Sequence, residues 1–196
     1  AAGTINSGRS GYDPLNGPVA GADTLTEYIR EARRDRSVRA IVVRIDSPGG
    51  SVSHALAMYN ILSKHKATKY VEYVGMSASA ATVIASVADK ENVKIAEYLT
   101  ILIHEARLQS WETLTTAKMK KLSSDIEKIN NNLAALYANQ TGGTVEEMRA
   151  LMATDSGEGV LLTAQEALDL GLVGQVVKTA KIAAFDSNYL QKAGYN

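Results

Sequence analysis

Apolar and polar residues alternate along the chain with two periods, one typical of strands and the other of helices. Short β-branched and aromatic runs predict buried strands at 39–45, 69–74, 93–104 (one or two strands) and 172–177. Stripes with helical spacing predict helices at 23–35, 54–65 and 80–88. Because strands and helices alternate, the pattern predicts an α/β fold with a mostly parallel sheet. The first 22 residues are rich in Gly, Ser, Asn and Pro and predict a loop or a short edge strand.

Three threonines, each followed three positions later by a glutamate, predict the starts of helices. Such a pair can form a capping box, in which each side chain accepts a hydrogen bond from the other residue's backbone N–H. The pairs are Thr24–Glu27, Thr144–Glu147 and Thr163–Glu166. We expect a helix to begin at each of them, the last one ending at Gly171.

One helix is predicted to be much longer than the others, covering about 112–139 and ending at the pair Gly142-Gly143. Its apolar stripe keeps helical spacing throughout and comprises Met119, Leu122, Ile126, Ile129, Leu133 and Leu136. Most helices in globular proteins are less than half this long. The helix can pack on the core of its own domain, or it can project and pair with another subunit.

The composition excludes several classes of function. Acidic and basic residues balance at 21 each without a basic block, which argues against nucleic acid or an anionic membrane as partner. The chain has no cysteine, so disulfides and thiolate chemistry are excluded, and no apolar run approaches a membrane span. A signal-peptide layout is absent from the N-terminal segment. We expect one cytoplasmic domain over 1–196, with a loop-like segment at 1–22 and a tail at 179–196.

Two serines occupy the junction between a predicted strand and an Ala-rich helix, in "GMSASAATVIA" (75–85). The unpaired N–H groups at a helix start can stabilise an oxyanion, so a serine there is a candidate nucleophile. Ser79 lies nearer the helix start than Ser77, and small residues follow it. A lone serine in such a place is more often a helix cap or a packing residue. Other signals are therefore needed.

Two further signals lie at the ends of other predicted strands. "SPGG" (47–50) follows the strand at 39–45, and its glycines allow close approach to an exposed backbone N–H. His104 ends the apolar run "LTILI", where a general base would stand in an open α/β sheet. An ordinary turn and a core histidine are the commoner explanations of each signal alone. His54 and His65 have no partner pattern and are interpreted as surface or structural residues.

Taken together, "RIDSPGGSV", "GMSASAATVIA" and "ILIHEA" resemble the Clp-type serine peptidase proteolytic subunit, including its phage-encoded relatives. The resemblance covers roughly 38–177 and includes the segment like the family's handle helix. It implies a Clp/crotonase-like fold of repeated ββα units with a long projecting handle helix. The resemblance also implies Ser79 as nucleophile, His104 as general base, and the N–H groups of Gly50 and Ala80 as oxyanion hole.

The resemblance carries expectations about partners as well. It implies a serine endopeptidase that acts on peptides or unfolded protein and assembles into homo-oligomeric rings, commonly stacked in pairs. No metal or organic cofactor is required, and any ATP-driven unfolding would come from a separate ATPase. The hydrophobic N-terminal loops of Clp subunits are not recognisable here, which puts such an ATPase in question.

The chain departs from the family at the acid that orients the histidine. That acid lies four residues before the Thr of "TAQEA", a position occupied here by Gly159. We expect Glu158 to serve, with Asp155 as the alternative and no third member as another. Without an orienting acid a triad typically works orders of magnitude more slowly.

The N-terminal part, at 21–53, resembles signal-peptide peptidase A, a relative that uses a Ser–Lys dyad. The candidate lysines in that case are Lys118, Lys120 and Lys121, although three clustered lysines are also typical of a solvated helix face. A non-catalytic ring or scaffold subunit is a further alternative. An acyl-CoA enzyme of the crotonase type shares the fold, but it would place acidic residues where Ser79 and His104 stand.

Overall fold

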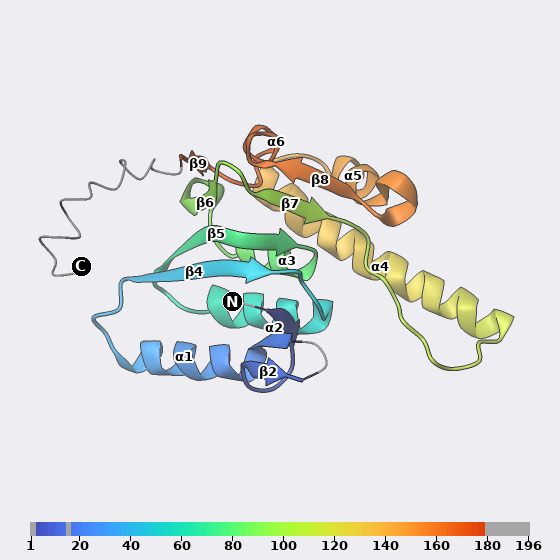
Figure 1. Ribbon diagram of the computed structural model, residues 1–196, viewed down its shortest axis with the longest axis horizontal. Coiled ribbons are helices and arrows are strands. Elements are labelled where there is room, and N and C mark those ends of the chain that lie inside the picture. The colour runs from blue at the N-terminus through green and yellow to red at the C-terminus, as the bar shows by residue number, and fades with distance from the viewer. Residues whose placement is uncertain (1–2, 15–16, 179–196) are drawn as a thin grey trace, which may run out of the picture.

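The computed structural model describes residues 3–14 and 17–178, and its centre is a six-stranded mixed sheet (Figure 1). The long strand β5 pairs with β4 along one edge and with β6 and then β7 along the other, all in parallel. β9 joins β6 in parallel, whereas β8 joins β7 antiparallel. The strands are β4 (Ala40–Ser47), β5 (Thr68–Ala78), β6 (Val93–Ala96), β7 (Thr100–Ile103), β8 (Val160–Thr163) and β9 (Gln175–Val177). The mostly parallel α/β architecture predicted from the sequence is confirmed.

Three helices cover one face of this sheet (Figure 1). They are α1 (Ala22–Arg34), α2 (Val52–Ser63) and α3 (Ala80–Ala85), and a short 3-10 turn, η1 (Lys90–Asn92), follows α3. In β4 the side chains of Val43, Ile45 and Ser47 point to the covered face and are buried, while those between them are exposed. All six residues of α3 are buried, so this helix lies inside the core.

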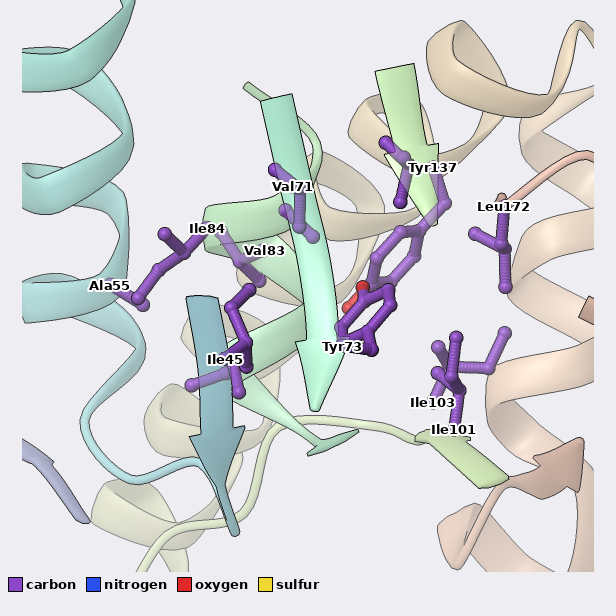
Figure 2. Close-up of a cluster of buried hydrophobic side chains, with 14 of the residues drawn as sticks. Ile45, Ala55, Val71, Tyr73, Val83, Ile84, Ile101, Ile103, Tyr137 and Leu172 are labelled. Carbon is purple, nitrogen blue, oxygen red and sulfur yellow. The ribbon is translucent and has the colours of Figure 1, made fainter. Parts of the chain in front are cut away.

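The core joins the central strands to these helices and to the C-terminal half of the chain (Figure 2). Ile45 and Val71 of the sheet lie beside Val83 and Ile84 of α3, and Tyr73 lies beside Tyr137. Burial raises the pKa of both tyrosines, that of Tyr137 to about 12. Both phenols therefore stay protonated at any physiological pH.

The N-terminal segment forms a second, three-stranded sheet of β1 (Thr4–Asn6), β3 (Gly17–Gly21) and β2 (Gly11–Asp13). The sequence predicted at most one edge strand here. The predicted cap at Thr24 is wrong. The helix begins at Ala22 instead, and the Thr24 hydroxyl accepts a hydrogen bond from Ser10 N at 2.7 Å. The loop between β1 and β2 supplies the competing donor, which the local Thr–Glu pattern cannot reveal.

The longest helix, α4 (Thr116–Thr141), is half packed and half projecting (Figure 1). Its buried residues all lie in its second half, namely Asn130, Leu133, Ala134, Tyr137 and Ala138. From its start to its middle the apolar stripe is open, with Met119 49% exposed and Ile129 38% exposed. The helix starts four residues later than predicted and ends at Gly142, in the left-handed conformation at φ 79°. The second half therefore packs on the core of its own domain and the first half projects, while pairing with another subunit stays a prediction.

The remaining elements are α5 (Val145–Gly157) and α6 (Ala164–Leu170), which pack with β8 beside α4 (Figure 1). Thr144 and Thr163 form complete capping boxes with Glu147 and Glu166, as predicted. Near its end α5 is kinked at 154–156, where Asp155 has φ 51°. The tail assigned to 179–196 lies outside the described residues. No helix among 3–14 and 17–178 is long and apolar enough to cross a membrane.

Candidate active site

Ser79 stands on a strained turn between β5 and α3. Its backbone has φ 56° and ψ −130°, a region that non-glycine residues rarely adopt. Such strain persists only where the surroundings enforce it, and it occurs preferentially at active sites. The Ser79 N–H donates to Leu102 O at 2.8 Å and its carbonyl accepts from the Thr82 hydroxyl at 2.6 Å, so the turn is fixed at both ends. The side chain of Ser79 is half-buried, whereas Ser77 is buried and donates to Gly75 O.

The turn after β4 lies directly against Ser79. A Cβ atom on Gly49 would come within 2.7 Å of the Ser79 Cβ and 2.9 Å of Ala80 N, so only glycine fits there. Gly50 is exposed, with φ 138°, and its neighbours bond to β1 through Ile5 N–Gly49 O (2.7 Å) and Ser51 N–Ile5 O (3.0 Å). Within the described residues neither Gly50 N–H nor Ala80 N–H has a hydrogen-bond acceptor. Two unpaired donors thus flank the serine.

Strand register brings His104 to the same edge of the sheet. Ala78 of β5 pairs with Leu102 of β7, so the residues that follow, Ser79 and His104, leave adjacent parallel strands at their carboxyl ends. On the other side of β5, Ser47 of β4 pairs with Ser77. Three neighbouring strand ends therefore present the glycine turn, the serine and the histidine in a row.

The His104 imidazole is held by its own main chain. Its Nδ1 lies 2.5 Å from the Glu105 carbonyl oxygen. A carbonyl only accepts, so Nδ1 carries the proton and Nε2 of the neutral ring keeps a free lone pair. Burial lowers the pKa of His104 below its usual value, which favours this neutral form. Among the described hydrogen bonds, none joins the ring to the Ser79 hydroxyl.

No carboxylate bonds to the imidazole in the described residues. Gly159 lies opposite His104, because β8 pairs antiparallel with β7 in the register Ile103–Val160. A Cβ on Gly159 would come within 2.0 Å of Ile103 O and 2.5 Å of the His104 Cα, so a side chain there would overlap the backbone. Glu158 forms an ion pair with Arg107, and Asp155 is exposed on the kink of α5.

Comparison with known proteins decides the family. The family model described as Clp protease matches residues 22–180. The chain belongs to the Clp protease family. It is therefore a serine-type peptidase, that is, a hydrolase of peptide bonds.

Curated relatives and a solved structure agree with this assignment to the Clp protease family. The chain is 26% identical over 156 residues to "ATP-dependent Clp protease proteolytic subunit 4" of Rhodococcus jostii, covering 80% of this chain and 77% of that protein. It is 29% identical over 145 residues to proteolytic subunit 1 of Thermobifida fusca, covering 74% and 63%. A single-substitution variant of ClpP1 from Listeria monocytogenes superposes with a TM-score of 0.72 at 21% identity, covering 91% and 90%. The predicted Clp/crotonase-like fold is thus confirmed.

The three lysines proposed for a dyad lie on the exposed half of α4. Lys118 pairs with Glu112, Lys121 lies 2.6 Å from Asp125, and Lys120 is exposed. A lysine acts as base only when burial lowers its pKa, and these side chains are solvated. The geometry gives no support to a dyad in this member of the Clp protease family.

Sequence reasoning did not identify the residues that hold the histidine. The Ala106 N–H donates to Asn130 Oδ1 on α4 at 2.7 Å, and Arg149 of α5 lies 2.8 Å from Glu105. Arg107 is three positions after His104, and its ion pair with Glu158 spans a gap of 51 positions. No local pattern marks such contacts. The available signal was Asn130, a polar residue within the apolar stripe of the long helix, which the structure shows to be buried.

Proposed function

We propose that the chain is an endopeptidase in which Ser79 is the nucleophile and His104 the general base. The observation that supports this most strongly is the strained conformation of Ser79 between two unpaired N–H groups, beside the strand end that bears His104. Strain at the strand-to-helix turn is also how other serine hydrolases expose a nucleophile.

In this mechanism Nε2 of His104 takes the Ser79 proton as the serine oxygen attacks the peptide carbonyl carbon. The Gly50 and Ala80 N–H groups donate to the oxyanion that develops. The histidine then gives its proton to the leaving amine, and an acyl-enzyme remains on Ser79. Water, deprotonated by His104, hydrolyses that ester and restores the serine.

We propose Glu158 as the acidic member that assists His104, in preference to Asp155. Glu158 directly precedes Gly159, which packs on His104, and its charge partly offsets the lowering of the imidazole pKa by burial. Asp155 lies on the exposed kink of α5 and contributes no interaction to His104 among those found. The carboxylate acts through its charge on the imidazolium that forms during catalysis, without a hydrogen bond to the ring.

The proposal also covers the assembly of the protein and its partners. We propose a homo-oligomeric ring, with rings stacked through the open apolar stripe of α4, and peptides or unfolded protein as substrates. The curated relatives are named as subunits of ATP-dependent proteases, which supports a separate ATPase partner. The cytoplasm is the compartment that we propose.

Labelling with a fluorophosphonate tests the nucleophile. We expect the wild-type protein to be labelled once and Ser79→Ala not at all, while Ser77→Ala remains labelled as the matched control. Hydrolysis of a small peptide or ester should be lost in His104→Ala and largely kept in Lys120→Ala. Labelling that survives in Ser79→Ala, or the reverse result for the two base variants, would refute the assignment.

A further inference from the structure

Four charged residues surround the loop that bears His104, and they form two ion pairs of different character. Glu105 and Arg149 are 2.8 Å apart, with side chains only 27% and 26% exposed. Arg107 and Glu158 form the second pair, with side chains 54% and 64% exposed. The first pair is sheltered by the fold, and the second is open to solvent and free to rearrange.

The acceptor that orients His104 is a fixed peptide group. The Glu105 carbonyl accepts from Nδ1, while the Glu105 N–H donates to Gly157 O at 3.3 Å. The next N–H, that of Ala106, donates to Asn130 at 2.7 Å. Because α4 and α5 hold this segment from both sides, the carbonyl keeps its place beside the ring.

Glu158 is the carboxylate next in sequence to Gly159, the residue that lies opposite His104. Position 159 has no room for a side chain against the His104 backbone. Glu158 is adjacent to that position, but Arg107 engages its carboxylate. A carboxylate stabilises an imidazolium better than a neutral carbonyl does, so the arrangement observed is the weaker of two orienting schemes.

We infer that Arg107 is a positioning residue that restrains the activity of this site. Its ion pair holds the Glu158 carboxylate off the imidazole, which leaves the Glu105 carbonyl to orient His104. Loss of the Arg107 charge frees Glu158 to bond to Nδ1 and strengthens the base. This inference rests on the proposed function, in which His104 is that base.

The charged groups near the ring give the direction of the pH effect. Arg107 lowers the pKa of His104 and Glu158 raises it, after the larger lowering by burial. From α5, Arg149 neutralises Glu105, and Asn130 of α4 and Ser79 are uncharged. Removing the Arg107 charge should therefore raise the pKa of His104, whereas removing the Glu158 charge should lower it.

The test is a double-mutant cycle with Arg107→Gln, Glu158→Gln and the two combined, followed as kcat against pH on a small ester substrate. An exposed ion pair shifts an equilibrium by up to about fivefold, so kcat of Arg107→Gln should rise about two- to fivefold. The gain should vanish in the double variant, and Arg107→Lys should stay near wild type. Arg9→Gln is the matched control. Arg9 forms a similar exposed ion pair, 2.8 Å from Glu27, and neither residue belongs to the site.

A second readout does not depend on turnover. The titration of His104 is followed by NMR of ¹³C-histidine protein carrying Ser79→Ala, where only three histidines give signals. We expect the pKa to move up with Arg107→Gln and down with Glu158→Gln. The inference would be overturned if Arg107→Gln changed kcat equally with and without the Glu158 carboxylate, or if Arg107→Gln lowered kcat. Failure of Ser79 to take the fluorophosphonate would refute the proposed function, whatever the titration shows.

Discussion

Replacement of Gly159 tests the packing that places His104. In Gly159→Ala the new Cβ would lie 2.0 Å from Ile103 O and 2.5 Å from the His104 Cβ, at a backbone φ of +84°. The left-handed conformation alone costs an alanine about 1–2 kcal/mol. Because the atoms in contact are mainly backbone, β7 must also shift, which adds about 1–3 kcal/mol. We expect a total loss of about 2–5 kcal/mol in the free energy of unfolding.

Gly142→Ala separates these two contributions. Gly142 has nearly the same φ, +79°, and nothing lies within 4 Å of an added Cβ. Urea denaturation should therefore show a loss of only about 1–2 kcal/mol for this control. Activity on a small ester should fall at least tenfold in Gly159→Ala, because the shift displaces His104, and should persist in Gly142→Ala. Equal destabilisation by both variants with unchanged activity, or higher activity in Gly159→Asp, would refute the reasoning.

Three further outcomes are expected. Burial lowers the pKa of His104 and the neutral ring is the base, so the acid limb of kcat/KM plotted against pH should have its midpoint below pH 6.5. A midpoint above that value would contradict the buried site. Met119→Asp, in the open stripe of α4, should reduce the molar mass measured by light scattering while circular dichroism keeps the helical signal, and an unchanged mass would exclude this stripe from the assembly. Thr163→Ala should cost about 1 kcal/mol in urea denaturation, since the hydroxyl caps Glu166 N; a loss below about 0.3 kcal/mol would show that the cap contributes little.

Much of the fold could be predicted because strands and helices carry local periodicity. The strand at 39–45 and the capping boxes at Thr144 and Thr163 depend on neighbours within a few residues, and the structure confirms them. Thr24 also has the local pattern, but its hydroxyl accepts from the N–H of Ser10, in the loop before β2 of the separate N-terminal sheet. Contacts between distant segments decide that case, and no local pattern encodes them.

The residues of the candidate site also fall into a group that the sequence could predict and a group that it could not. Ser79 and His104 were marked by strand ends and by resemblance to a family, and their shared edge follows from the parallel register of β5 and β7. The acid could not be fixed from the sequence. The choice between Glu158 and Asp155 depends on the kink at 154–156 and on the ion pair to Arg107, both of which are tertiary features.

The second half of α4 has contacts with both catalytic segments. Tyr137 donates to the Thr82 hydroxyl at 2.6 Å, and that hydroxyl donates to the carbonyl of the nucleophile. Asn130, seven residues earlier on the same helix, accepts from the peptide that follows the base segment. The two contacts lie about two helical turns, or about 10 Å, apart along α4, so the helix links the segment that follows Ser79 to the segment that follows His104. A bend introduced between these two side chains would change the catalytic spacing without altering any residue that touches substrate.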